Sequence, residues 1–522
     1  MIDVVIAGGG PNGLMLAGEL GLNGIRPVVL DPMPGPNPMR RANGVIGQGV
    51  RILDHRGLYG TLAGATEPPR LNPRPMFAAF PLDLTSIDSQ VFLLPVQQPK
   101  LVQVLADRAG EHDVDIRWGH ALTGFDQDDS GVTVEVTGPD GSYALRAKYL
   151  IGADGGTSMT RKLAGIEFPG MSSYDVVARM GFDIVPPDEW IDPVSGVLDV
   201  PGYGRIPPLG FHRVERGVLA LGALGRRAAV ICFELDPTAR AEPAEDNFDG
   251  QPMSLEELEA SVKRVLGADL PLRPVSPGAD LDLRRFAGIN SRIASRYQAG
   301  RVILVGDAAH VHSPMGGPGL NLGLQDAVNL GWKLAAVVRG RVEPALLATY
   351  EAERRPAAER VIMHSRAQLA LVRPGPEVSA LRQLFSELLT DSEIARRLGD
   401  LISGAENRYG TDPDAHPLTG HWVPDFGVTD GDVTRRVAEL ARTGQPMLID
   451  LTDSGCVAAA VADAADELTV AVGRPDRELL ATALLVRPDG YVAWASSAAS
   501  PDVVELRRAL ARWFGLGATT WR

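Results

Sequence analysis

The segment from Arg301 to Val338 constrains the fold more than any other part of this chain. An apolar, strand-like run reaches Asp307, a glycine-rich loop follows, and a long helical pattern completes the segment. Glycines at positions 316, 317 and 319 allow a backbone to approach a flat ligand closely, and the helix N-terminus directs free N–H groups and a positive dipole end toward that ligand. The segment therefore predicts a strand, loop and helix that hold a cofactor.

A nucleotide-binding loop lies at the other end of the chain. The apolar run of residues 2–7 is followed by Gly8-Gly9-Gly10-Pro11-Asn12-Gly13, a helical pattern, and a second apolar run that ends at Asp31. This is GxGxxG between a strand and a helix with an acid about 20 residues further on, which is typical of dinucleotide binding. Gly8 permits the turn, Gly10 admits a pyrophosphate, Gly13 allows close helix packing, and Asp31 can accept from a ribose hydroxyl. The motif does not distinguish FAD from NAD(P).

Length, charge and cysteine usage exclude several classes of protein. The 522 residues suffice for two or three domains, and the net charge of -14, with no long run of like charges, argues against a nucleic-acid partner. Cys232 and Cys456 are the only cysteines, so we expect no disulfide framework, no cysteine-rich metal site and a cytoplasmic location. The first strand begins at residue 2 and no uncharged apolar run reaches membrane-spanning length, which predicts a soluble protein without signal peptide or anchor.

Three further segments, taken with the two above, resemble a known family. They are RRANGVIGQGVRILDHRGL from residue 40, LLPVQQPKLVQVLADRA from residue 93 and YLIGADGGTSMTRKLAGI from residue 149. The chain resembles, over essentially its whole length, the class A flavin monooxygenases of the p-hydroxybenzoate hydroxylase type, in the branch of aromatic polyketide hydroxylases and rifampicin monooxygenases. The resemblance implies an α/β fold: a Rossmann-like FAD-binding domain, a β-sheet substrate domain and a C-terminal thioredoxin-like domain.

The resemblance also implies a role for individual residues. Arg41 matches the arginine near the FAD pyrophosphate, Gln98 the glutamine that reaches the flavin or ribityl chain, and Asp154 the start of a DG motif, running to Arg161, that touches FAD and the path of the nicotinamide nucleotide. Asp307 matches the acid that holds the ribitol. With the glycine motif, the implied cofactor-binding residues are Gly8, Gly10, Pro11, Asn12, Gly13, Asp31, Arg41, Gln98, Leu122, Asp154, Asp307, Pro314, Gly317, Gly319, Leu320 and Asn321.

The glycine-rich loop carries the flavin-ring end of this implied site. Pro314 corresponds to the proline beside the isoalloxazine, and Leu320 and Asn321 supply backbone N–H groups toward its pyrimidine edge. A reduced flavin carries negative charge at that edge, so N–H groups and a helix dipole stabilise it. Pro318 departs from the family pattern, since relatives commonly carry Gln or Lys there. This proline stiffens the loop and removes both an N–H group and a polar side chain.

Several tempting residues have simpler interpretations. His310 and His312 could be bases or metal ligands, but the sequence supplies no further ligands, so we predict no metal and structural or FAD-proximal roles. Asp326 and Lys333 are interpreted as helix-surface or packing residues. His212 is a weak candidate for a base that assists substrate deprotonation, and is better interpreted as a turn residue.

The domain boundaries follow changes in pattern. We expect a discontinuous FAD-binding domain (1–171 with 284–400), a substrate-binding β-sheet domain (172–283) and a thioredoxin-like domain without CxxC (412–522). In the middle domain, Ser254 and Glu257 predict a capped helix over 253–267. In the last domain, Pro488-Asp489-Gly490 predicts a hairpin turn. Because Val457, Ala458 and Ala459 follow Cys456, no dithiol cycle is possible, and a packing or interface domain is predicted.

The function that the resemblance implies is FAD-dependent monooxygenation of an aromatic, fused-ring polyketide-type substrate with O2 and NAD(P)H, NADPH being favoured. Hydride would reduce FAD, oxygen would form a C4a-hydroperoxyflavin, and an electron-rich phenol would attack its distal oxygen without any catalytic side-chain nucleophile. Baeyer-Villiger oxygenation of a ketone on the same scaffold is the alternative, followed by a non-catalytic flavoprotein. We expect a monomer or homodimer with no nucleic-acid or membrane partner.

Overall fold

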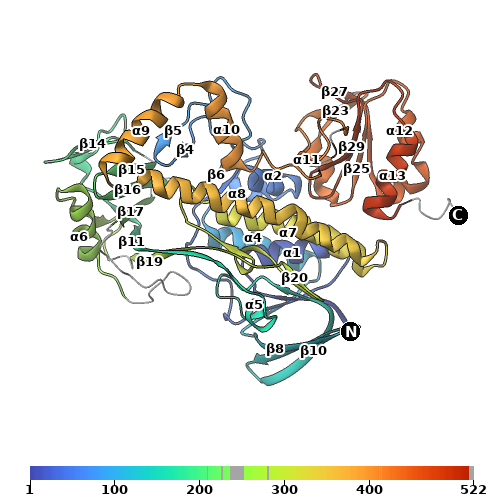
Figure 1. The fold of residues 1–522 in the computed structure, drawn as a ribbon, viewed down its shortest axis with the longest axis horizontal. Coiled ribbons are helices and arrows are strands. Elements are labelled where there is room, and N and C mark those ends of the chain that lie inside the picture. Colours follow the sequence, from blue (N-terminus) through green and yellow to red (C-terminus); the bar gives the residue numbers. More distant parts are fainter. Residues whose placement is uncertain are drawn as a thin grey trace.

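The computed structural model describes residues 1–208, 210–224, 227–235, 252–278, 281–410, 412 and 414–516. Residues 236–251 of the predicted middle domain and residues 517–522 of the predicted last domain lie outside the described residues. The fold is mixed α/β, and three sheets organise it (Figure 1).

The first sheet has eight strands and carries most of the predicted cofactor residues. Its main path runs β20-β21-β10-β1-β2-β7, and the hairpin of β8 and β9 continues from β10. The central strand β1 pairs in parallel with both β2 and β10, and β10 pairs in parallel with β21. The strands are β1 (Ile2–Ala7), β2 (Val28–Asp31), β7 (Asp115–Trp118), β8 (Ala121–Asp128), β9 (Gly131–Gly138), β10 (Gly141–Gly152), β20 (Gln298–Ala299) and β21 (Val302–Leu304).

The strand β1 is apolar along its length because both of its faces are covered. Val4 and Ile6 pack in the large core with α1 (Pro11–Leu22), α4 (Gln98–Glu111) and α7 (Pro318–Val338). Val5 and Ala7 point to the other face, where the strand β9 supplies valines 132, 134 and 136. A run that reads as continuously apolar is the expected pattern for a parallel strand buried on two sides.

The second sheet lies in the middle of the chain and is joined to the first by two long strands. Its order is β15-β16-β17-β11-β19-β22. These strands are β11 (Gly170–Phe182), β15 (Gly210–Val214), β16 (Gly217–Leu224), β17 (Arg227–Leu235), β19 (Asp282–Ile293) and β22 (His310–Val311). The predicted boundaries at 171/172 and 283/284 therefore fall inside β11 and β19 rather than in linkers.

The two faces of this second sheet are covered by different elements. On one face lies α6 (Leu255–Leu266), whose N-cap Ser254 accepts from the backbone N–H of Glu257 at 3.3 Å, as the sequence predicts. The other face meets an apolar cluster formed with β4 (Met76–Phe77), β5 (Phe80–Pro81), α9 (Pro376–Leu388) and α10 (Ser392–Ser403). The long helix α8 (Ala348–Val372) leads from the first sheet toward these helices (Figure 1).

The third sheet forms the C-terminal region, which we define as residues 416–516. Its order is β26-β25-β28-β29, with β25 and β26 parallel and the hairpin of β28 and β29 antiparallel. The hairpin turns at Gly490, whose φ is +86°, as Pro488-Asp489-Gly490 predicts. The elements are β25 (Met447–Asp450), α12 (Cys456–Ala459), β26 (Thr469–Val472), β28 (Ala483–Val486), β29 (Val492–Ser496) and α13 (Val503–Phe514).

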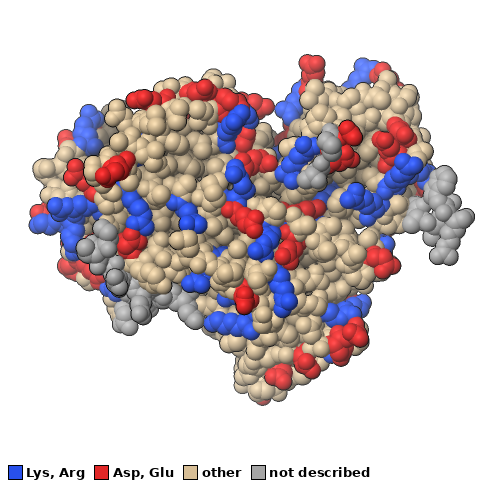
Figure 2. Space-filling model, in the orientation of Figure 1, with Lys and Arg blue, Asp and Glu red and all other residues tan. Residues whose placement is uncertain are grey.

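Shorter elements complete the described chain. They are α2 (Gln48–His55), α3 (Tyr59–Ala63), α5 (Met159–Leu163), α11 (Val437–Leu440), β3 (Val45–Ile46) with β6 (Leu93–Leu94), β12 (Ile184–Val185) with β18 (Arg273–Pro274), β13 (Leu198–Val200) with β14 (Gly204–Ile206), and β23 (Gly427–Asp430) with β24 (Val433–Arg436) and β27 (Arg474–Pro475). On the face shown in Figure 2, basic and acidic side chains are interspersed. Among the described helices, none is long and apolar enough to cross a membrane.

The two cysteines differ in environment, which predicts different reactivity. Cys232 on β17 is fully buried, and this burial raises the pKa of its thiol to about 12, whereas Cys456 is half-buried at the start of α12. We expect a disulfide-exchange reagent at pH 8 to modify one thiol per native chain, and two after unfolding in guanidinium, because the thiolate is the reactive form. The Cys456→Ser variant should then show no native reaction; fast labelling of that variant would contradict the burial of Cys232.

Candidate active site

The predicted cofactor residues meet where the parallel strands of the first sheet end. Parallel strands direct their carboxyl ends to one edge, so the loops after β1, β2, β10 and β21 lie side by side. Backbone hydrogen bonds join these loops: Gly8 N–H donates to Leu30, and Ala153 N–H donates to Ala7, both at 2.8 Å. Val305 N–H donates to Gly152 at 2.9 Å. Segments from three distant parts of the sequence thus form one edge.

The glycines of the first loop have two different functions. A Cβ on Gly13 would lie 1.9 Å from the carbonyl oxygen of Gly8, and one on Gly8 would lie 2.3 Å from that of Ala153. These two glycines therefore allow close backbone packing, as the sequence predicts for Gly13. Gly10, by contrast, has no atom within 4 Å of an added Cβ. The space beside Gly10, at the N-terminus of α1, is open to a ligand.

Asp31 closes this loop from the neighbouring strand. Its Oδ2 accepts from the backbone N–H of Gly9 at 2.7 Å, and its Oδ1 accepts from that of Met33 at 2.9 Å. A carboxylate has more acceptor sites than these two bonds use, so Asp31 can still accept from a ligand hydroxyl. Pro11 follows at the first position of α1, where a missing N–H group costs no helix hydrogen bond.

Asp154, the first residue of the DG motif, stabilises the helix that follows it. Its carboxylate accepts from Ser158 Oγ at 2.5 Å, and from the backbone N–H and the hydroxyl of Thr160 at 2.8 and 2.9 Å. It therefore fixes the first turn of α5. Arg161 in the same helix donates to the carbonyl oxygen of Ala308 at 2.9 Å and lies over the ring of Phe168. The segment after β10 is in this way tied to the segment after β21.

Asp307 is exposed in a turn whose neighbours are buried. Its flanking residues Gly306 and Ala308 are buried, whereas no hydrogen bond or ion pair joins its carboxylate to the part of the chain that the structure describes. The turn needs Gly306 because φ there is +63° and because the amide of Asn12 lies 2.1 Å from the position of an added Cβ. Asn12 packs in the same way against Gly323 of α7. The Asn12 side chain therefore lies between the Asp307 turn and α7.

Exposed and buried residues alternate along the glycine-rich loop before α7. Pro314 and Gly317 are exposed, and a Cβ on Gly317 would meet no atom within 4 Å. Pro318 is buried at the first helical position, so its fixed φ suits the start of α7 and removes only an N–H that the helix cannot use. The N–H groups of the next residues, Gly319 and Leu320, lie in the first turn, where they lack partners within the helix and can bind a ligand.

Three hydrogen bonds hold this helix start and the segment of Arg41 in place. Asn321 Oδ1 accepts from the backbone N–H of Ile46 at 2.7 Å, and its Nδ2 donates to the carbonyl oxygen of Gly317 at 3.0 Å. The backbone N–H of Gln98 donates to the carbonyl oxygen of Ala42 at 2.9 Å, which places the start of α4 beside the exposed Arg41. Asn321 is thus bonded to the strand β3, and Gln98 to the residue that follows Arg41.

The last two candidates, Leu122 and His212, lie in different sheets. Leu122, on β8, packs with the apolar cluster on the face of the first sheet opposite α1 and α7. His212 is on a strand, β15, and not in a turn; its ring bonds to the hydroxyl of Tyr203 at 2.7 Å, on the α6 side of the second sheet. The alternate residue Phe211 faces the opposite side, toward Met315 of the glycine-rich loop. His212 is therefore not positioned to act on a substrate near that loop.

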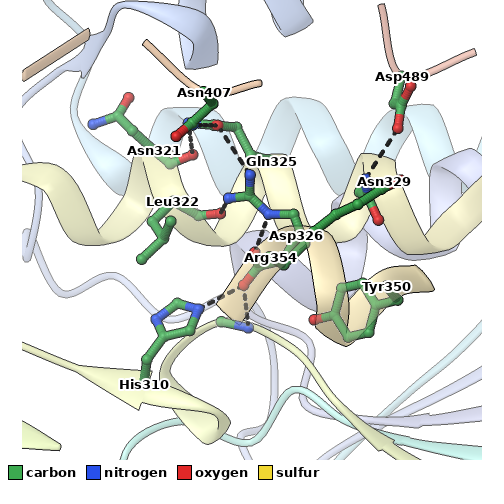
Figure 3. Close-up of polar contacts among 12 residues, drawn as sticks. His310, Asn321, Leu322, Gln325, Asp326, Asn329, Tyr350, Arg354, Asn407 and Asp489 are labelled. Carbon is green, nitrogen blue, oxygen red and sulfur yellow. Dashed lines mark hydrogen bonds and ion pairs between the residues drawn. The ribbon is translucent and has the colours of Figure 1, made fainter. Parts of the chain in front are cut away.

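Behind the loop lies a buried polar network that the sequence analysis did not predict (Figure 3). The Asp326 side chain is fully buried; its Oδ2 accepts from His310 Nε2 at 2.6 Å and from Gly306 N–H at 3.3 Å, and its Oδ1 accepts from Arg354 Nε at 2.7 Å. Burial alone would raise the pKa of Asp326, but His310 and Arg354 hold it below the ordinary value. No group of three or more metal-ligating side chains occurs among the described residues.

The interpretation of Asp326 and Lys333 as helix-surface residues is wrong, although both do pack. The two side chains are fully buried, because α7 is covered on nearly all sides. One signal was available in the sequence: a helix that is apolar around its whole circumference is a buried helix, so its few polar residues need buried partners. The identity of those partners, Glu353 and Arg354 on α8, was not readable from α7.

An apolar wall adjoins the loop on the side of the second sheet. Met315 packs in one cluster with aliphatic and aromatic side chains from both sheet and helices, among them Phe77, Phe80, Val176 and Phe233. His312 borders the loop, and its burial lowers the pKa of its imidazole, an effect that nearby Asp307 counteracts. The polar edge formed by the loops and this apolar cluster thus meet at residues 312–317.

The chain matches known families and relatives over most of its length. Residues 1–365 match the family model described as FAD binding domain, and residues 416–516 match the model described as aromatic-ring hydroxylase, C-terminal. The sequence is 40% identical to the 12-dehydrotetracycline 5-monooxygenase/anhydrotetracycline 6-monooxygenase of Streptomyces rimosus, over 98% of this chain and 99% of that protein. It is 35% identical to the rifampicin monooxygenase of Streptomyces venezuelae, over 99% of both chains.

A solved structure agrees with these sequence matches. The anhydrotetracycline hydroxylase from Streptomyces rimosus superposes with a TM-score of 0.83 at 38% identity, covering 98% of this chain and 99% of that one. The residues described above fit FAD: open space lies beside Gly10 and Gly317, the exposed carboxylate of Asp307 is unpaired among the described residues, and N–H groups without helix partners begin α1 and α7.

The contrast between Gly13 and Gly10 can be tested by alanine substitution. We expect Gly13→Ala to destabilise the protein by about 1–3 kcal/mol or to prevent its folding, because the new Cβ meets backbone that cannot move aside. Gly10→Ala should fold with the melting temperature of the wild-type apoprotein, because Gly10 has φ -75° and open space, and should bind FAD more weakly. Equal melting temperatures of the Gly13→Ala and Gly10→Ala apoproteins would contradict the different functions assigned to the two glycines.

The role of Asp307 can be separated from folding. Since its carboxylate has no described partner, Asp307→Ala should retain the wild-type far-UV circular dichroism and lose the bound flavin. Asp307→Asn keeps one acceptor oxygen and should retain an intermediate amount. The flavin content of each purified protein is measured by the ratio of its visible flavin absorbance to its ultraviolet protein absorbance. Stoichiometric FAD in the alanine variant would rule out a ribitol contact.

Proposed function

The chain belongs to the FAD-dependent aromatic-ring hydroxylases, and from this premise we propose that it hydroxylates a fused-ring aromatic substrate of the polyketide type. It is an FAD-dependent, NAD(P)H-consuming aromatic monooxygenase, and NADPH is the proposed hydride donor. The observation that carries the proposal is the junction at residues 312–317, where the polar cofactor edge of the first sheet meets the apolar wall around Met315. The names of two relatives, which act on anhydrotetracycline and rifampicin, support a polycyclic substrate.

We propose that FAD lies along the edge formed by the loops of the first sheet. Its pyrophosphate would lie beside Gly10 at the N-terminus of α1, and its adenosine ribose beside Asp31. Asp307 would accept from the ribitol, and the N–H groups of Leu320 and Asn321 would face the pyrimidine edge of the ring. When bound, FAD supplies the redox chemistry: it accepts a hydride from NAD(P)H and activates O2 for transfer of one oxygen atom.

The protein's own contribution is placement and exclusion of water. The Pro318 ring and the Asn321 bonds to Ile46 and Gly317 hold the α7 N-terminus in one conformation, so its donors are oriented before any ligand binds. The apolar wall, with Phe77, Phe80 and Phe233, suits a planar aromatic substrate and keeps water from the reacting edge. The geometry requires no side-chain nucleophile.

The division of the chain follows the same proposal. Residues 1–171 with 284–400 would form a Rossmann-like FAD-binding domain, and 172–283 a substrate domain. Residues 412–522 would form a thioredoxin-like domain that has no dithiol. The parallel order of the first sheet and the mixed order β26-β25-β28-β29 of the third support this division.

Anaerobic reduction followed by oxygenation tests the proposed function. We expect NADPH to bleach the yellow holoprotein faster when a fused-ring phenol such as anhydrotetracycline is present. Admission of ¹⁸O₂ should then give a product heavier by one labelled oxygen atom, and NMR should place that oxygen on an aromatic carbon rather than beside a ketone. If neither NADPH nor NADH bleaches the flavin with any aromatic of a polyketide panel, the monooxygenase proposal is wrong.

A further inference from the structure

Charged side chains are buried together where α7 and α8 meet the C-terminal region. Each has a side-chain exposure of at most 9%, and the charges balance, which matters because an unpaired buried charge is very costly. The cations are Lys333, Arg354 and Arg487, and the anions are Asp326, Glu353 and Asp489. The network extends from the C-terminal hairpin to the turn that carries Asp307.

The hairpin between β28 and β29 makes the first set of contacts. The guanidinium of Arg487 donates from both Nη atoms to Glu353 of α8, at 2.7 Å each. Asn329 of α7 donates to Asp489 Oδ2 at 3.1 Å, and Lys333 donates to Glu353 at 2.6 Å. Because these bonds are buried and their geometry is specific, they fix α7 and α8 relative to the C-terminal region.

Tyr409, which precedes the C-terminal region, is held by it. Its backbone N–H donates to the carbonyl oxygen of Gly420 at 2.8 Å, and its ring stacks on Tyr491 at a centroid distance of 3.9 Å. Its hydroxyl oxygen accepts from Arg354 Nη1 at 2.9 Å. The position of the Arg354 guanidinium therefore depends on a side chain that the C-terminal region fixes.

The other end of Arg354 reaches the cofactor side. Its Nε donates to Asp326, whose second oxygen accepts from Gly306 and His310, the residues on either side of the 307–309 segment (Figure 3). A carboxylate is planar, so a rotation forced by Arg354 moves both acceptor positions together. Gln325 and Leu322 also accept from Arg354, which leaves its guanidinium little freedom to compensate for a lost partner.

From this continuous path we propose that the C-terminal region positions the Asp307 turn for FAD, with Tyr409, Arg354 and Asp326 as positioning residues. This assigns to the C-terminal region, which has no dithiol, a role in cofactor binding that is exerted through α7 and α8. The inference rests on the FAD site and needs no particular substrate, so it can fail while the proposed hydroxylation stands.

The Tyr409→Phe variant tests the path because it removes only the hydroxyl and keeps the ring stacked on Tyr491. We expect the FAD dissociation constant of the apoprotein, measured from flavin fluorescence, to rise about tenfold, the effect of one lost hydrogen bond to a charged group. Hydrogen exchange in peptides covering residues 302–317 should become faster, and the midpoint potential of the bound flavin should shift.

Asp54→Asn is the matched control. Asp54 on α2 pairs with Arg436 of the C-terminal region at 2.8 Å, so this variant weakens the same interface without touching Arg354. It should lower the melting temperature while leaving the FAD dissociation constant, the 302–317 exchange and the flavin potential at wild-type values. The proposal is overturned if Tyr409→Phe changes these three quantities no more than Asp54→Asn does, or if Tyr409→Phe leaves them unchanged.

Discussion

The carboxylate of Asp326 is the contact on which the arrangement of the cofactor residues depends. It projects from α7, is fully buried, and accepts from Arg354 of α8, from Gly306 in the Asp307 turn and from His310. Arg354 balances its charge, and loss of one partner in such a buried pair typically costs about 3–5 kcal/mol. The helix that presents N–H groups and the turn that presents Asp307 are therefore held by the same two oxygens.

Close backbone packing holds the ends of β1 and β10 in place, as Asp326 holds the turn that follows β21. Gly8, Gly13 and Gly306 allow contacts that any side chain would prevent, and Asn12 fills the space between the Gly306 turn and α7. The result is an edge that presents the N–H groups of the helix starts and the carboxylate of Asp307 outward, on a closely packed backbone. A site that is preorganised in this way loses little conformational entropy when a ligand binds.

The proposed site has a polar half, formed by the loops of the first sheet, and an apolar half around Met315. Polar groups gather at the strand ends and the helix starts, whereas Met315 packs into a cluster of aliphatic and aromatic side chains. A cofactor with a charged chain and a flat ring suits the first half, and an aromatic substrate suits the second. The C-terminal region contributes no group to either half directly; its contacts reach the site through Arg354 and the buried face of α7.

Local pattern and motif chemistry in the sequence determined the strands and helices, the two glycine loops, the Ser254 cap, the 488–490 turn and the family, because each of these depends on residues close in the chain. Only the tertiary structure decided the burial of Asp326 and Lys333, the face on which His212 lies, and the link from Tyr491 through Tyr409 to Arg354. The reason is physical: a charged residue on a helix is stable at the surface or inside, and the choice depends on partners from distant segments, which helical periodicity does not encode.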